Sequence, residues 1–178
     1  MKSTSRNPWI IADTHFGHQK IIDFESRPFH SLEEMDETLI NNCNKKVKGD
    51  QDFFILGDYS FYGRDKTMEL TSRLHGRKIL ITGNHDGKSR KFYLDCGFSE
   101  VINYPIVYED FFILSHKPLY MNKNTPYVNI FGHVHGNPMY KDMTSCSFCV
   151  SAERTHYTPI SLDEIKRKLQ QIPGKHWR

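Results

Sequence analysis

Five times along this chain, a short apolar run ends in a compact group of aspartate, asparagine or histidine residues. The apolar runs have the length and composition of buried β-strands. The polar residues that lie just past them are Asp13, Asp58, Asn84, His116 and His133. In sheets whose strands alternate with helices, ligands bind beyond the carboxyl ends of the strands. The pattern therefore predicts an α/β fold that gathers these side chains at one edge.

The first half of the chain alternates predicted strands with predicted helices. The strands are 9–12, 53–56 and 78–81. Ser31-Leu-Glu-Glu34 is a capping box that predicts the start of a helix, and Leu32, Met35, Leu39 and Cys43 form its apolar stripe. Two more helices are predicted around Thr67–Leu74 and Ser89–Asp95.

The second half is richer in strands. The predicted strands are 101–108, 111–114, 127–131 and 148–151, with a hairpin turn at Glu109-Asp110. A last helix begins at the capping box Ser161-Leu-Asp-Glu164 and turns Leu162, Ile165, Leu169 and Ile172 inward. We expect one α/β domain over residues 1–178, with its sheets sandwiched between helices.

Composition limits the class of protein. A chain of 178 residues fits one domain with its own core. The formal charge of +3 is compatible with an anionic substrate but does not favour a protein that coats nucleic acid. The start of the chain has no signal-peptide pattern, and no apolar run is long enough for a membrane span. We therefore expect no membrane partner, a cytoplasmic location and four reduced, structural cysteines.

The polar groups offer the ligands of a metal site. Alone, Asp13-Thr-His15 could be a polar turn, and Gly57-Asp58 could be an ordinary turn. Two carboxylates at one pole of the fold repel each other unless a cation lies between them. Gly83-Asn84-His85-Asp86 adds an amide oxygen, and Gly132-His133-Val-His135 adds two imidazoles, with His116 as a third. Nitrogen and oxygen ligands without a thiolate suit Mn, Fe or Zn better than Ca or Mg.

In this order, the motifs DTH, GD, GNHD, SH and GHVH resemble those of the calcineurin-like metallophosphoesterases. The resemblance covers almost the whole chain, and the opening DTHFGH is similar to that of small, capless bacterial and phage enzymes. It implies a four-layer fold, a two-sheet β-sandwich flanked by helices. It also implies one ion held by Asp13, His15, Asp58 and His135, and a second ion held by Asp58, Asn84, His116 and His133. Asp58 would bridge the two ions, and His85 would be the catalytic histidine that binds neither.

These roles imply phosphoester hydrolysis. Two ions ~3.5–4 Å apart share a hydroxide that can attack phosphorus, and a protonated His85 can stabilise charge or protonate the leaving oxygen. We expect two divalent transition-metal ions, Mn²⁺ first, with Fe, Zn and Ni as alternatives. One position departs from the family: Phe61 stands where several branches have a polar side chain that orients the catalytic histidine. Asp86 or a main-chain carbonyl would then orient His85.

The substrate is less constrained than the metal site. His18 and Arg64 are candidate phosphate-binding residues. Loop packing would explain His18 equally well, and a solvated charge at a helix start is the commoner case for Arg64. Tyr59, Phe61 and Tyr62 are candidates for stacking on a nucleobase, with packing as the alternative. A capless site favours a small phosphodiester, including a nucleotide-like one. A phosphomonoesterase, a nuclease that uses the basic run Lys166-Arg-Lys168, and a non-catalytic scaffold are the alternatives.

Overall fold

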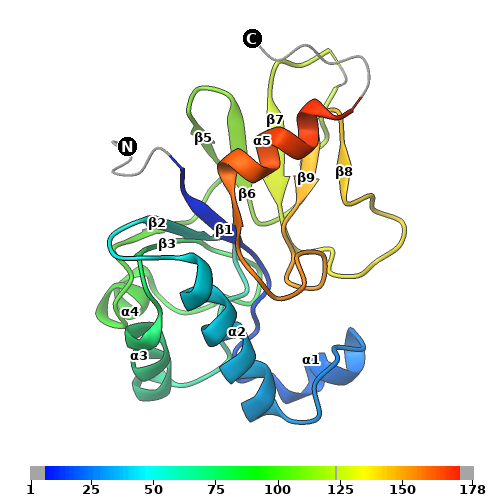
Figure 1. Ribbon diagram of the computed structural model, residues 1–178. Helices are drawn as coiled ribbons and strands as arrows, with labels where there is room; N and C mark the ends of the chain where they lie inside the picture. Colours follow the sequence, from blue (N-terminus) through cyan, green and yellow to red (C-terminus); the bar gives the residue numbers. More distant parts are fainter. Residues whose placement is uncertain (1–6, 123, 173–178) are drawn as a thin grey trace.

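The computed structural model describes residues 7–122 and 124–172, and these form two five-stranded sheets packed face to face (Figure 1). The first sheet has the strand order β10-β1-β2-β3-β4, in which β1 to β4 run parallel and β10 is antiparallel to β1. Its strands are β1 (Trp9–Ile11), β2 (Asp52–Ile55), β3 (Arg77–Ile81), β4 (Glu100–Ile102) and β10 (Ile160–Ser161). The parallel order brings the ends of β1, β2 and β3 to one edge.

The second sheet has the strand order β5-β6-β7-β9-β8. Its strands are β5 (Ile106–Tyr108), β6 (Phe112–Ser115), β7 (Val128–Phe131), β8 (Met143–Thr144) and β9 (Ser147–Cys149). The three central strands β6, β7 and β9 are parallel, and β5 and β8 are antiparallel edges. Isolated pairing of Ala12 with Ser151 joins the end of β1 to the chain that leaves β9. The polar ends of the two sheets therefore meet.

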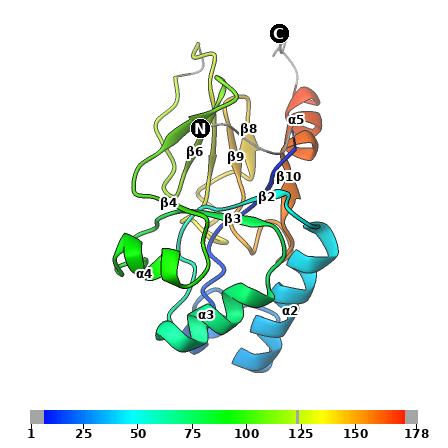
Figure 2. The ribbon, with the colours of Figure 1, turned by 90° about the vertical axis from the view of Figure 1, so that its left-hand side faces the viewer.

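Four helices lie on the outer side of the first sheet (Figures 1 and 2). They are α1 (Gln19–Phe24), α2 (Leu32–Lys46), α3 (Arg64–Arg73) and α4 (Arg90–Asp95). The hydroxyls of Ser31 and Ser89 cap α2 and α4 by accepting hydrogen bonds from backbone amides in the first turn. The cap at Ser31 is the one that its capping box predicts. One hydrophobic core lies between these helices and the sheet, and it includes Met35, Leu39 and Leu70.

A second hydrophobic core lies between the two sheets. Ile10 and Phe54 of the first sheet pack there with Leu114 and Ile130 of the second. The last helix, α5 (Leu162–Gln170), is capped by Ser161 and contributes Leu162, Ile165 and Leu169 to this core, with Ile172 packed against it. The predicted α/β architecture of two sheets with flanking helices is confirmed.

Several boundaries differ from the sequence prediction. The apolar run 101–108 is not one strand: β4 ends at Ile102, and β5 begins at Ile106 in the other sheet. Pro105 lies in the connection, where it needs no ladder hydrogen bond. The helix α1 and the two-residue strands β8 and β10 were not predicted, because such short elements carry little periodic signal. The predicted turn at Glu109-Asp110 is confirmed, and both residues have positive φ.

Candidate metal centre

The first group of candidate ligands comes from the loops after β1 and β7. Asp13, His15 and His135 place ligand atoms within 4.8 Å of one another. Asp13 and His15 are buried, yet Asp13 Oδ1 and His15 Nε2 have no hydrogen-bond partner among residues 7–122 and 124–172. Buried polar atoms are rarely left unpaired, and a bound cation would satisfy both of these. Burial, followed by the nearby charge of His135, strongly lowers the pKa of His15 and keeps a ring lone pair free.

The second group comes from both sheets. Asp58, His116 and His133 also place ligand atoms within 4.8 Å of one another. His116 donates its Nδ1–H to the Leu56 carbonyl at 2.9 Å, which leaves its Nε2 free. That Nε2 lies 2.9 Å from Asn84 Oδ1 and 3.1 Å from His133 Nδ1, spacings expected of atoms that share one ion. The structure thus brings Asn84 to this group as well.

Asp58 lies between the two groups. Its Oδ2 is 3.6 Å from His15 Nε2 and 3.5 Å from His116 Nε2, so this one oxygen faces ligands of both groups. Its Oδ1 accepts a hydrogen bond from the His85 backbone amide at 2.8 Å. A carboxylate in this position could contact two ions at once.

The backbone is strained where these side chains converge. The left-handed region, which non-glycine residues rarely adopt, is occupied by Asp13, His15, Asp58, His133 and His135. Such conformations cost roughly 1–3 kcal/mol each and persist only where the surroundings enforce them. Loops that turn in this way aim several side chains at one point immediately after a strand.

The donor set fits divalent transition metals. It consists of carboxylate oxygen, imidazole nitrogen and one amide oxygen, and no cysteine belongs to either group in the part of the chain that the structure describes. The buried Asp13 needs a cation beside it: burial raises its pKa to about 6, even though His135 and His116 act to lower it. The residues present therefore fit two metal ions in adjacent positions.

Comparison with known proteins places this geometry in a family. Residues 7–145 match the profile of the calcineurin-like phosphoesterases. The chain belongs to the calcineurin-like phosphoesterase family. Its members hydrolyse phosphate esters, so this chain is a phosphate-ester hydrolase with a metal-binding site. The resemblance inferred from the motif order is confirmed.

Relatives of this calcineurin-like phosphoesterase come from archaea, bacteria and a phage. An uncharacterised protein of Methanocaldococcus jannaschii is 34% identical, and the match covers 93% of each chain. The gene 66 protein of Mycobacterium phage L5 is 36% identical over 46% of this chain and 40% of its own. A protein of unknown function from Aquifex aeolicus has a similar structure, with a TM-score of 0.70 and 27% identity over 91% of this chain and 98% of that one.

His85, the residue expected to be catalytic, lies exposed at the rim of the site. Its ring centroid is 5.6 Å from that of His15 and 5.3 Å from that of Phe61. The expectation that Asp86 orients this ring is not supported. Asp86 is buried, and its carboxylate accepts hydrogen bonds from the backbone amides of Asp58, Tyr59 and Gly83 and from the Tyr93 hydroxyl. Asp86 therefore holds the loops after β2 and β3 together.

Two functional residues have no signal in the sequence. Arg27 is buried and donates hydrogen bonds to the Asp13 and Thr14 carbonyls at 2.7 and 3.0 Å. It also pairs with Glu153, whose Oε1 lies 3.1 Å from His135 Nδ1. Burial acts to raise the pKa of Glu153, but the hydrogen bond with His135 and the charge of Arg27 outweigh burial and lower it. The Glu153 carboxylate therefore holds the Nδ1 side of the His135 ring.

Only some of the residues considered for substrate binding lie beside the candidate ligands. His18 lies beside the site and stacks on Phe61, with ring centroids 4.0 Å apart. Arg64 pairs with Asp95 at 2.8 Å, and none of its described contacts reaches a candidate ligand. Tyr59 is buried and bonded to Thr71, so stacking of Tyr59 on a base is ruled out.

Tyr62 is half-buried and donates a hydrogen bond to Asp36, which leaves Phe61 as the exposed aromatic residue after Asp58. Cys43, Cys96, Cys146 and Cys149 are all free in the structure. In the described ranges 7–122 and 124–172, no helix has the length and apolar character that crossing a membrane requires.

Proposed function

We propose that this chain is a dinuclear metal-dependent phosphodiesterase that acts on a small, nucleotide-like diester. The observation that carries the proposal is the position of Asp58 Oδ2, 3.6 Å from His15 and 3.5 Å from His116. Asp13, His15, Asp58 and His135 would hold one ion, and Asp58, Asn84, His116 and His133 would hold the other. When bound, two such ions would supply Lewis-acid activation of water and neutralise charge on the phosphate.

Mn²⁺ is the proposed metal, with Fe, Zn and Ni as alternatives. The proposal rests on the donor types, since imidazole and carboxylate together suit these ions and the thiolates that favour other metals are absent from both groups. The family membership supports divalent metals in general. The four free cysteines fit a reducing compartment, so we propose the cytoplasm as the location.

The proposed role of His85 is proton donation. Its backbone amide is anchored to Asp58 Oδ1, so its ring is held beside the candidate ligands while remaining exposed to substrate. A ring N–H of His85 would donate its proton to the leaving ester oxygen. The ring centroids of Phe61 and His85 are 5.3 Å apart. Phe61 therefore restricts the movement of the His85 ring by packing, and its side chain offers no hydrogen bond.

A diester is favoured over a monoester because the rim of the site offers surface for a second substituent. The exposed Phe61 stacks on the half-buried His18 beside the first ligand group, where a flat organic group could pack. A phosphomonoesterase is the second candidate, since the same ligands would serve it. A nuclease is less well supported, because Lys166 in the basic run of α5 already pairs with Glu109.

Hydrolysis of bis-p-nitrophenyl phosphate and p-nitrophenyl phosphate by metal-stripped protein, with and without added Mn²⁺, tests this proposal. We expect diester turnover that requires metal and falls by about 10²–10⁴ in His85→Ala. His75→Ala is the matched control, because His75 is exposed on the loop after α3. Preference for the monoester would contradict the diester assignment, and metal binding without turnover of either ester would contradict the enzymatic proposal.

A further inference from the structure

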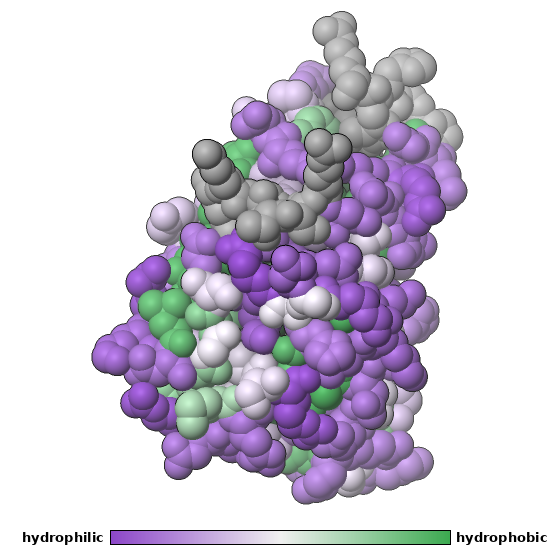
Figure 3. Space-filling model, turned by 60° about the vertical axis from the view of Figure 1, so that its left-hand side comes forward, coloured by the Kyte–Doolittle hydropathy of each residue, from purple (hydrophilic) through white to green (hydrophobic). Residues whose placement is uncertain are grey.

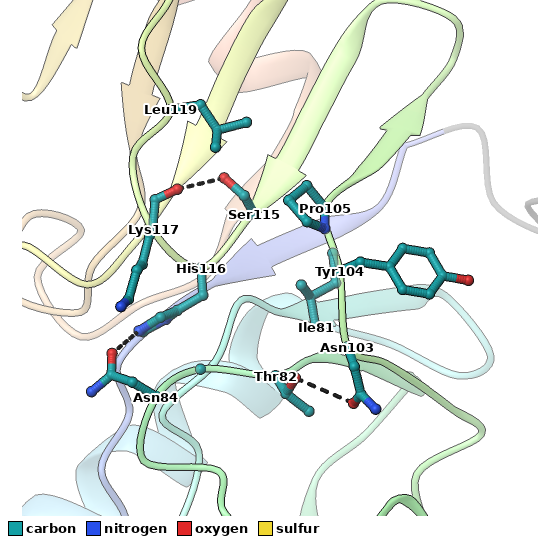
Figure 4. Close-up of a pocket in the computed structure, with 11 residues that line it drawn as sticks. Ile81, Thr82, Asn84, Asn103, Tyr104, Pro105, Ser115, His116, Lys117 and Leu119 are labelled. Atoms are coloured by element: carbon teal, nitrogen blue, oxygen red, sulfur yellow. Dashed lines mark hydrogen bonds between the residues drawn. The ribbon is translucent and has the colours of Figure 1, made fainter.

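A pocket of about 340 Å³ opens beside the second ligand group, at the seam between the two sheets. Three segments line it: the end of β3 and the loop after it, the connection from β4 to β5, and the loop after β6 (Figure 4). Asn84 and His116 belong both to this lining and to the candidate metal centre. A phosphate held at that centre would therefore lie at the mouth of the pocket.

The pocket is suited to an anion. Lys117 lines it, and no aspartate or glutamate does. Lys117 is exposed and forms no ion pair with any residue of 7–122 or 124–172. Its side chain runs along the wall toward Asn84 (Figure 4).

The rest of the lining is suited to an organic group. Ile81, Pro105 and Leu119 give it apolar surface, and the Leu119 side chain points into it (Figure 4). Asn103 Oδ1 lies 3.3 Å from the Thr82 hydroxyl, which donates to it, so the Asn103 amide nitrogen remains able to donate to a ligand. This mixture of apolar surface with a few polar groups is typical of small-molecule sites.

We propose that this pocket binds one nucleotide unit of the substrate. Lys117 pairs with a phosphate oxygen, the apolar wall around Leu119 packs against the base or sugar, and Asn103 donates to a polar edge. The volume lies at the low end of the range of roughly 300–1,000 Å³ for ligand pockets, which suits one unit rather than a strand. The inference rests on the proposed function, because it assigns a place to one of the two substituents of the diester.

Calorimetric titration of the Mn²⁺-loaded protein with thymidine 5′-monophosphate and with inorganic phosphate tests the inference. We expect the nucleotide to bind at least about tenfold more tightly than phosphate. Leu119→Trp, which fills the pocket from its half-exposed rim, should remove most of this difference and leave phosphate affinity within about twofold. Lys117→Met should weaken both ligands by about tenfold, since it removes a charge-assisted hydrogen bond. Lys45→Met, on the exposed face of α2, is the matched control and should weaken neither.

Equal affinity for the nucleotide and phosphate in the unmodified protein would overturn the inference, as would an unchanged nucleotide affinity in Leu119→Trp. Tighter binding of hexathymidylate than of the mononucleotide would overturn the assignment to a single unit. The two proposals fail separately. If the protein hydrolyses no diester but binds the nucleotide as described, the pocket assignment stands and the proposed function falls.

One face of the described part of the chain carries mainly polar side chains on its surface. The face in Figure 3 is mainly hydrophilic, and its hydrophobic residues form small, separated groups outside the grey atoms. Contiguous apolar patches of several hundred Å² are the usual mark of a docking surface.

Discussion

The guanidinium of Arg27 joins two loops that are distant in sequence. It holds the carbonyls of Asp13 and Thr14 after β1 and pairs with Glu153, which is 126 positions away. Glu153 in turn holds His135. Carboxylates that hold the second nitrogen of a ligating histidine fix its tautomer and orientation. At the scale of the residue, one buried ion pair therefore keeps a strained loop and an imidazole in place.

Glu153→Gln should weaken Mn²⁺ binding by about 10–100-fold, because glutamine keeps the shape but loses the charge that holds His135 and Arg27. Calorimetric titration of metal-stripped protein with Mn²⁺ measures the effect. Glu33→Gln, on the exposed face of α2, is the matched control and should change the affinity by less than about twofold. Equal affinities of Glu153→Gln and the unmodified protein would show that His135 needs no such support.

At the scale of the element, the candidate metal ligands come together because the loops that follow the strands approach one another closely. Gly83, after β3, has its Cα so close to the loop after β2 that an added Cβ would lie 2.6 Å from the Asp58 amide nitrogen and would also collide with the Asp58 carboxylate. Gly132, after β7, is similarly close to Asp13. Parallel strands bring these loops to one edge, and the lack of a side chain allows the final approach.

Gly83→Ala should destabilise the protein by about 1–3 kcal/mol and weaken Mn²⁺ binding, because the new methyl group displaces Asp58. Gly87→Ala is a matched control on the same loop, since a Cβ there meets nothing within 4 Å. Urea unfolding and Mn²⁺ titration of both variants test this. Similar loss of stability and of metal affinity in the two variants would refute the steric explanation.

At the scale of the whole molecule, the site is assembled across the seam of the sandwich. The first sheet supplies Asp13, His15, Asp58 and Asn84, and the second supplies His116, His133 and His135. The apolar core between the sheets therefore fixes the distance between the two sets of ligands. Metal binding should stabilise the fold, because it favours the native state over the unfolded chain.

The contribution of Asp13 to the stability of metal-free protein should fall as pH rises from about 4 to about 6. The folded pKa of Asp13, about 6, lies above its ordinary value of 3.8, so its contribution is complete below 3.8 and is lost as pH rises through 6. The shift corresponds to at most about 3 kcal/mol. Metal-free Asp13→Asn should lack this loss and be more stable than the unmodified protein near neutral pH.

Urea unfolding with a chelator and with Mn²⁺ at several pH values measures this dependence. The other buried carboxyls with raised pKa, Asp36 and Asp86, are present in both proteins and cancel in the comparison. Mn²⁺ should reverse the order of stability, because only the intact site gains from the metal. Asp23→Asn, an exposed carboxylate on α1, should behave as the unmodified protein does. Parallel pH curves for Asp13→Asn and the unmodified protein would contradict the prediction.

The sequence by itself determined the features that depend on neighbours along the chain. An apolar run and the polar motif that follows it are neighbours in the chain, so local sequence predicted where the strands end. Ser31 and Ser161 cap helices, as predicted, because a cap needs only the next three residues. The types of candidate ligand and their order were predicted from short local motifs for the same reason. The resemblance to the family was inferred from the same motifs. Their roles toward metal stay predictions, although the structure brings all seven side chains together.

Only the tertiary structure decided the features that depend on contacts across the chain. The link from Arg27 through Glu153 to His135, the role of Asp86 between two loops, and the pocket beside Lys117 each join segments that no local pattern connects. The same holds for the division of residues 101–108 between two sheets, because a continuous apolar run does not record which partner each part pairs with. Pairing partners and buried polar contacts are set by packing in three dimensions, and short-range propensity carries no information about them.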